Sequence, residues 1–99
     1  MAGFDIHQID EVIHGRMRLG VMAYLIDADV AEFTELKHVL KATQGNLSIH
    51  LGKLEAAGYI AMEKRFRDRK SLTEVRLTDA GRAAFADYLQ ALAKLILPG

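Results

Sequence analysis

The sequence predicts a mainly α-helical domain with one two-stranded β-hairpin, an α+β class whose elements follow the order α-α-α-α-β-β-α. Apolar residues recur at helical spacing up to Gly58, alternate with polar residues between Ile60 and Leu77, and return to helical spacing after that. The chain has 99 residues, a single proline near its end and no glycine-serine tract that would act as a linker. Residues 1–99 are therefore expected to form a single domain.

The first helical stretch is the densest in apolar side chains. Residues 9–28 predict either one buried helix or two, and in the second case the break falls at Gly15. The first of two helices would then run from Ile9 to His14. Gly20 lowers the helix propensity of the remainder, because glycine lacks the side chain that restricts the unfolded backbone.

Two short helices are predicted next. Residues 34–41 carry apolar side chains at i, i+3 and i+4, which is the pattern of an amphipathic helix. After a junction of three or four residues, Leu47, Leu51 and Leu54 recur at i, i+4 and i+7. Gly58 follows this repeat, and glycine commonly occupies the position just after a helix end. The second helix therefore follows the first through a tight turn.

A change of period after Gly58 predicts the hairpin. Two runs alternate as half-buried strands do, with Ile60, Met62 and Phe66 on one parity of the first and Thr73, Val75 and Leu77 on one parity of the second. Residues 64–70, between these runs, read KRFRDRK and form a charged tip. This tip has no Asn-Gly turn signal, so the sequence leaves the register of the hairpin open.

The chain ends in a long amphipathic helix at about residues 78–97. Thr78 is the expected N-cap, Asp79 lies near the positive helix end, and Pro98 stops the helix. The apolar stripe of this helix consists of Phe85, Tyr88, Leu89, Leu92, Leu95 and Ile96. That stripe exceeds what the core of a 99-residue chain is expected to cover, and an uncovered stripe indicates an interface. We expect a homodimer, with the first helix contributing; the alternative is that the last helix folds back onto its own core.

Two short helices followed by a basic hairpin form the layout of a winged helix-turn-helix. In that layout the second helix enters the roughly 12 Å wide major groove of DNA while the hairpin, or wing, reaches the adjacent backbone or minor groove. A projection at 100° per residue puts the polar face of the second helix opposite the Leu47 direction, and no acidic residue lies on it. The predicted DNA-binding residues are Gln44, Asn46, Ser48, Ile49, Lys53, Arg65, Arg67, Arg69 and Lys70.

The hairpin tip holds five cations in seven residues. An exposed sheet edge needs only a charge or two to prevent aggregation, so this cluster favours a polyanionic partner such as double-stranded DNA. Two interpretations without a binding role stay open: the polar face of the second helix is an ordinary solvated face, and the hairpin tip is a highly soluble loop. A third is a winged-helix module that binds protein and docks an acidic partner through its hairpin.

Two motifs carry a resemblance to a known family. The run GNLSIHLGKLEAAGYI at 45–60, the basic hairpin after it and LTDAGRAAF at 77–85 resemble the small stand-alone winged-helix regulators related to MarR-type and ArsR-type repressors. The resemblance covers about residues 9–97. It implies a homodimeric transcriptional regulator with a recognition helix at about 44–57 and a wing at about 64–71. Family members often have proline where this chain has Asp79, and both residue types suit a first helical turn.

Composition excludes several classes. Because cysteine is absent, the chain has no disulfide, thiolate nucleophile or cysteine zinc site, and a cytoplasmic location is expected. No apolar run approaches the roughly 20 residues that span a bilayer, so no membrane partner is expected. No phosphate loop or catalytic constellation is present, which predicts that the chain is not an enzyme and uses no cofactor. The sequence identifies no small-molecule effector.

The four histidines raise the question of a metal site. His7, Glu11 and His14 would share one helical face if a helix began by residue 7, and two histidines with one carboxylate can bind zinc. Ordinary surface or interface histidines are the more common case, so no metal ligand is predicted.

The formal net charge of zero conceals two opposite halves. Residues 1–36 hold seven acidic residues and two arginines, and residues 37–99 hold eleven basic and six acidic residues. The halves therefore carry net charges of −5 and +5. This division predicts a polar molecule whose negative half lies behind the recognition helix and wing, away from phosphate.

Overall fold

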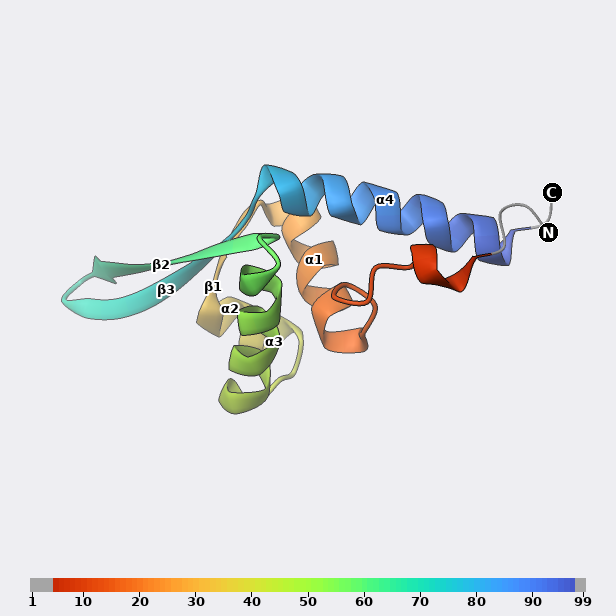
Figure 1. Cartoon of the computed structure of the whole chain (residues 1–99). Helices are drawn as coiled ribbons and strands as arrows, with labels where there is room; N and C mark the ends of the chain where they lie inside the picture. Colours follow the sequence, from red (N-terminus) through yellow and green to blue (C-terminus); the bar gives the residue numbers. More distant parts are fainter. Residues whose placement is uncertain (1–4, 98–99) are drawn as a thin grey trace.

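The fold was analysed in a computed structural model, which describes residues 5–97. Pro98 lies outside this range. The elements in chain order are the 3₁₀ turn η1 (Ile6–Gln8), α1 (Arg16–Ala28), β1 (Val30–Glu32), α2 (Phe33–Val39), α3 (Gln44–Ala56), β2 (Ile60–Arg67), β3 (Lys70–Leu77) and α4 (Asp79–Ile96) (Figure 1). The α+β class, the two short helices α2 and α3 and the hairpin β2–β3 are confirmed as a winged helix. Two segments differ from the predicted order α-α-α-α-β-β-α.

The first difference is a third strand. β1 pairs antiparallel with β3, and the sheet has the order β1-β3-β2. Ala31 is buried between its half-buried neighbours Val30 and Glu32. A strand of three residues is too short to display an alternating pattern, so the sequence between two helices gave no sign of it.

The second difference concerns the expected first helix from Ile9 to His14. This segment is a turn that follows η1, and Oδ1 of Asp10 accepts hydrogen bonds from the backbone N–H groups of Val12 at 2.8 Å and Ile13 at 3.1 Å. An aspartate that binds backbone N–H groups two and three residues ahead offers them an alternative to helical hydrogen bonds. Ile9 and Ile13 are nevertheless buried. The apolar pattern therefore predicted the burial of these residues correctly, but the prediction of a helix was wrong.

The core lies where α1, α3, the sheet and the first half of α4 meet. Val21, Met22 and Leu25 of α1 are buried against the leucines of α3 and against the inner sheet residues Val75 and Leu77. Asp10 links the turn before α1 to the segment that leads into β2, because its Oδ2 accepts a hydrogen bond from the Tyr59 hydroxyl at 2.5 Å. That hydrogen bond, assisted by partial burial, raises the pKa of Tyr59 to about 12.

The start of α4 is fixed by two contacts. Thr78 is the N-cap as predicted, since its hydroxyl oxygen accepts from the N–H of Gly81 at 2.9 Å. A Cβ placed on Gly81 would lie 2.0 Å from the carbonyl oxygen of Tyr59. Glycine is therefore the residue that lets the first turn of α4 pack directly on the backbone that leads into β2.

The molecule is elongated, with principal extents of 57 × 25 × 21 Å. Its radius of gyration is 15.0 Å, whereas about 13 Å is typical of a compact chain of this length. The hairpin and α4 project in opposite directions from the helical body, and η1 lies beside the distal part of α4 (Figure 1). Within residues 5–97 no helix is both long and apolar enough to span a membrane.

The projecting hairpin corrects one prediction. Phe66, expected on the half-buried side of its strand, is 81% exposed. The alternation of Ile60, Met62 and Phe66 is real, but the strand outruns the body of the domain, so its last residues have nothing to pack against. Periodicity defines the face of a strand, and it does not define how far the core reaches along that face.

Candidate nucleic-acid interface

The recognition helix α3 has one buried and one open face. Leu47, Leu51 and Leu54 are fully buried, which confirms the predicted core direction. Thr43 caps the helix by accepting a hydrogen bond from the N–H of Asn46 at 3.2 Å. The five residues predicted to face DNA from this helix are all exposed, namely Gln44, Asn46, Ser48, Ile49 and Lys53. The side chain of Ile49 is 62% exposed, which gives the open face an apolar centre.

Two glycines on the open face have no packing role within the chain. A Cβ added to Gly45 or Gly52 would meet no atom within 4 Å. Glycine inside a helix destabilises it by about 0.5–1 kcal/mol relative to alanine, and nothing in the fold recovers that loss. The two positions lower the profile of α3 on the side away from the core. They suit close approach of a large rigid surface.

The flank of α3 is held by an arginine of α1. The guanidinium of Arg18 donates to Nδ1 of His50 at 2.9 Å and also donates to the carbonyl oxygens of Val12 and Glu11 in the preceding turn. Partial burial, and then the positive charges of Arg18 and Lys53, lower the pKa of His50. His50 therefore contacts α1 through Arg18 and lies on the flank of α3, away from its open face.

The wing is a hairpin with a two-residue loop. Its last strand pair is Arg67 with Lys70, which leaves Asp68 and Arg69 as the loop. Both loop residues have positive φ angles, 52° and 66°, which defines a type I′ turn. Aspartate tolerates that conformation, but for arginine it costs about 1–2 kcal/mol relative to an ordinary turn. The register that the sequence left open is thus fixed by a turn without the usual glycine.

The hairpin register divides the wing into two faces. The outer face carries Glu63, Arg65, Arg67, Lys70, Leu72 and Glu74, and the inner face carries Lys64, Phe66, Ser71 and Thr73. The inner face continues the side of the sheet that is buried in the core at Ile60, Val75 and Leu77. A groove of about 330 Å³ separates it from α3 and is lined by Ser48, Leu51, Met62, Lys64 and Thr73 among others.

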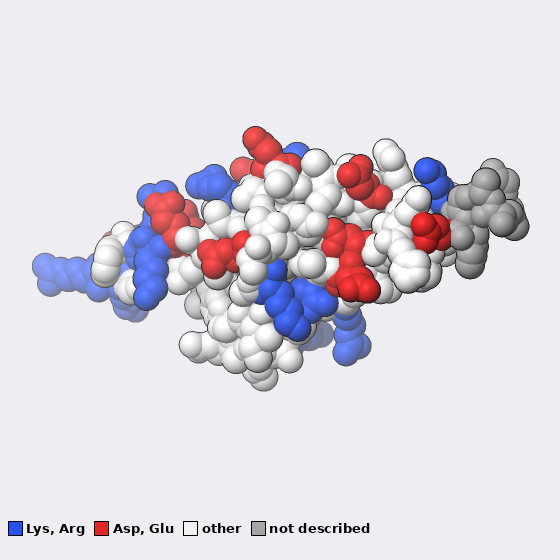
Figure 2. All heavy atoms as spheres, in the orientation of Figure 1, with Lys and Arg blue, Asp and Glu red and all other residues white. Residues whose placement is uncertain are grey.

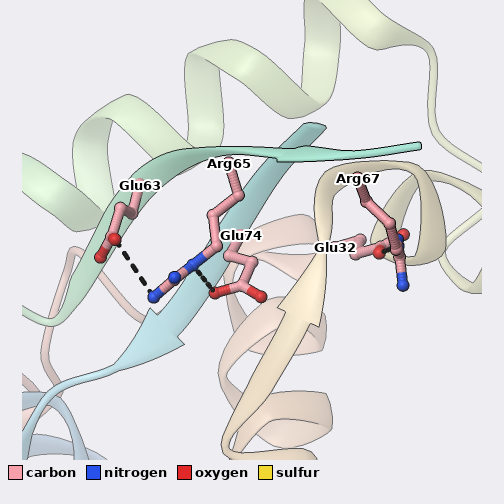
Figure 3. A network of polar contacts seen from close by, with 5 residues as sticks. All are labelled: Glu32, Glu63, Arg65, Arg67 and Glu74. Atoms are coloured by element: carbon pink, nitrogen blue, oxygen red, sulfur yellow. Dashed lines mark hydrogen bonds and ion pairs between the residues drawn. The ribbon is translucent and has the colours of Figure 1, made fainter. Parts of the chain in front are cut away.

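The two arginines of the outer face form ion pairs with carboxylates (Figure 3). Arg65 contacts Glu63 at 3.1 Å and Glu74 at 2.9 Å, and Arg67 forms an ion pair with Glu32 from the end of β1. Glu32 belongs to the negative half of the chain, which was expected to lie behind the wing. That expectation is wrong at this point, because β1 joins the sheet beside β3 and brings its carboxylate to the base of the wing.

The remaining cations of this region are unpaired. Within residues 5–97, Lys53, Lys64, Arg69 and Lys70 take part in no ion pair. Figure 2 shows the basic side chains gathered over the projecting hairpin, with acidic ones at its base and along the opposite half of the molecule. The charge separation predicted from the sequence is therefore only partial, because carboxylates lie at the wing base and basic side chains also lie outside the hairpin.

The residues predicted at a dimer interface fall into two groups. Phe85 and Tyr88 are buried in the core of the chain itself, where their rings lie 6.2 Å apart and the Tyr88 hydroxyl meets Nδ1 of His14 at 2.9 Å. The others lie farther along α4, where Leu92 and Leu95 are half-buried and Leu89 and Ile96 are exposed. Exposed Ile6 and Leu97 extend this second group into an apolar surface at the end of the molecule opposite the wing.

The histidines do not form a metal site in the described part of the chain. A shared helical face for His7, Glu11 and His14 requires a helix from residue 7, and η1 ends at Gln8. No group of three histidine or carboxylate side chains within residues 5–97 could hold a metal ion.

Two kinds of residue in this candidate interface were not predicted from the sequence. Lys64 was counted in the charged tip but not among the DNA-binding residues, although strand parity separates it from Arg65. Glu32 and Arg18 left no local signal, because each acts on a residue more than thirty positions away. Only the pairing of β1 with β3 and the packing of α1 on α3 bring them to the interface.

Comparison with known proteins agrees with this geometry. A family of winged helix DNA-binding domains matches residues 17–96. The uncharacterized protein MJ0432 of Methanocaldococcus jannaschii is 32% identical over 85 residues, which cover 86% of this chain and 92% of that protein.

Solved structures show the same fold. The transcriptional regulator homologue of Pyrococcus horikoshii OT3 superposes with a TM-score of 0.87 at 30% identity, over 97% of this chain and 95% of that one. Sco3205, a MarR family transcriptional regulator of Streptomyces coelicolor solved in complex with DNA, superposes with a TM-score of 0.67 at 20% identity. In that case 91% of this chain matches 63% of the larger protein, so the likeness is one of fold.

Proposed function

The chain belongs to the winged helix DNA-binding domain family of transcriptional regulators, and from that premise we propose that it is a cytoplasmic homodimeric repressor of a pseudo-palindromic operator. The family is one of DNA-binding proteins and not of enzymes, as the sequence predicted. In this proposal α3 lies in the major groove and the wing lies along the backbone or in the minor groove. Occupancy of a promoter then blocks transcription.

The observation that carries the proposal is the open face of α3. It combines hydrogen-bonding groups from Asn46 and Ser48, a cation from Lys53 and an exposed apolar side chain from Ile49. The hydrogen-bonding groups can bind base edges, the cation can bind phosphate, and the apolar side chain can contact the methyl group of thymine. The bare glycines between them allow the helix backbone to approach the groove floor, which a merely solvated helix face does not require.

The second part of the proposal is a two-fold dimer through the distal half of α4. Leu89 and Ile96 are 48% and 67% exposed, and Leu92 and Leu95 lie beside them. A second copy that covers this surface would leave both wings and both α3 helices free at the far ends. Two-fold symmetry then requires the recognition helices to meet half-sites about one DNA turn, roughly 34 Å, apart or a multiple of it.

Sedimentation equilibrium at micromolar concentration tests the dimer. We expect the wild-type chain to have twice the mass of the protomer and Leu89→Lys to have the protomer mass, because a buried ammonium group would lack a partner. Gln90→Lys is the matched control, since Gln90 is exposed next to Leu89 and lies on the polar side of α4. A wild-type chain of protomer mass would contradict the dimer.

In vitro selection of bound duplexes from a random library tests DNA binding. The expected product is an inverted repeat, and its affinity should fall steeply with salt. Four unpaired cations per protomer give up to eight phosphate contacts per dimer, so the slope of log affinity against log salt should be roughly −5 to −7. No enrichment of any duplex would contradict the proposal and favour the alternative in which the hairpin docks an acidic protein.

A further inference from the structure

Phe66 is the most exposed of the large apolar side chains in the described part of the chain, at 81%. It lies on β2 one residue before the end of the strand, and its cross-strand partner Ser71 gives it no apolar cover. Burying a phenylalanine stabilises a protein by about 1.5–3 kcal/mol, so this ring contributes almost none of that to the fold. A ring in this position is available to a partner.

The surroundings of Phe66 define the chemistry of that partner. The ring shares the inner face of the wing with Lys64, and the tip beside it carries Asp68 and Arg69, with Lys70 on the outer face. The three cations Lys64, Arg69 and Lys70 are unpaired within residues 5–97. The carboxylates of the wing base contact arginines of the outer face instead. An apolar ring among free cations matches a ligand with both phosphates and flat apolar surfaces, which nucleic acid provides.

The position of the ring also relates to the recognition helix. The inner face borders the groove whose opposite wall is α3, so Phe66 lies on the side of the wing that a duplex seated on α3 would meet. Apolar side chains of minor-groove binders pack between base steps and partly unstack them. Steps that unstack easily, such as TA and CA, accept such a wedge at lower cost.

We propose that Phe66 is a specificity-determining residue that inserts into the minor groove next to each half-site and favours easily unstacked base steps there. This inference rests on the proposed function, because it requires DNA to lie across α3 and the wing. It assigns to the wing a sequence preference that its cations do not provide, since phosphate contacts position a protein without reading bases.

Binding of the selected duplex by Phe66→Ala tests the inference. Loss of one aromatic–base contact should weaken binding about tenfold, with an unchanged salt slope because no charge is removed. Leu72→Ala is the matched control, since Leu72 lies on the outer face of the same hairpin, and it should bind as the wild type does. Fluorescence of 2-aminopurine placed in the flanking step should rise with the wild type and stay low with Phe66→Ala.

The outcomes separate the two proposals. If the wild type binds no duplex, the proposed function fails, and the role of Phe66 fails with it. If the wild type binds and Phe66→Ala binds equally well at all flanking steps, only the present inference is overturned. A Phe66-dependent association with anionic lipid vesicles, with DNA affinity unchanged by the substitution, would also overturn it. The melting temperature of Phe66→Ala should match that of the wild type, because Phe66 is exposed.

Discussion

Arg18 of α1 donates a hydrogen bond to Nδ1 of His50 of α3 at 2.9 Å. Because arginine can only donate, Nδ1 of His50 must be the acceptor, and the single ring proton of the neutral histidine lies on Nε2. The same guanidinium holds the carbonyl oxygens of residues 11 and 12, so one side chain fixes the recognition helix to the turn before α1. Protonation of His50 would place a donor opposite a donor and break this contact.

The first prediction is a dependence of stability on His50 and pH. The pKa of His50 is lowered by burial and by Arg18 and Lys53, so below its ordinary value of 6.5 the unfolded chain binds the proton more readily. This histidine therefore leaves stability unaffected above about pH 6.5, and it lowers stability as pH falls from there towards its folded pKa. Thermal unfolding at about pH 7.5 and about pH 5.5 should show a smaller loss of stability in His50→Gln than in the wild type.

His38→Gln is the control for this measurement. His38 is an exposed histidine of α2, and its side chain forms no hydrogen bond within the described residues. The variant His38→Gln should lose as much stability between the two pH values as the wild type does. An equal loss of stability in His50→Gln and the wild type would contradict the role given to the Arg18–His50 pair.

The second prediction separates stability from binding at Gly52. Alanine fits there without contacts, so Gly52→Ala should raise the free energy of unfolding by about 0.5–1 kcal/mol. The added methyl group stands on the open face of α3 and should weaken duplex binding. Urea unfolding and a binding titration give the two quantities. A variant that is more stable and binds as well as the wild type would remove Gly52 from the DNA interface.

The third prediction concerns Gly81, where alanine should have the opposite effect on stability. A Cβ at this position would overlap the carbonyl oxygen of Tyr59, and backbone cannot rotate away as a side chain can. Gly81→Ala should therefore lower the free energy of unfolding by about 3 kcal/mol, the upper part of the range for overpacking. Urea unfolding checks this, with Ala80→Gly, exposed one residue earlier, as the comparison.

The fourth prediction compares two arginines of the wing. Arg69 is unpaired within residues 5–97, whereas Arg67 is engaged by Glu32. Arg69→Ala should reduce the magnitude of the salt slope by about one unit per protomer, and Arg67→Ala by less. Glu32→Gln should release Arg67 and make the slope steeper. Equal losses from the two alanine variants would show that DNA displaces Glu32 from Arg67.

Parts of this picture could be predicted from the sequence because they depend on local pattern. The leucine repeat of α3, the cap at Thr78 and the cationic tip are all local, and the structure has them where the sequence placed them. Gly58 also ends α3 as predicted, with a φ angle of 82°. It forms the C′ residue of a Schellman motif in which the N–H of Tyr59 donates to the carbonyl of Leu54 at 3.0 Å.

Other parts depend on contacts between distant segments and carry no local signal. The turn at Asp10 looked helical, because its isoleucines are buried at helical spacing while a single side chain redirects the backbone. Phe66 looked half-buried, because strand parity does not reveal where the body of the domain ends. The pairing of Glu32 with Arg67 required knowledge of β1, which is too short for any periodicity.

The position of β1 has a consequence for the order in which the protein folds. The hairpin β2–β3 closes through two residues, whereas β1 pairs Val30 with Arg76, roughly 45 residues away. The entropy lost in closing a loop grows with its length, so the hairpin is expected to form first and β1 to join its free edge later. The contact of Glu32 with Arg67 depends on that late step. A wing that has closed its turn but not yet received β1 would carry Arg67 without its carboxylate.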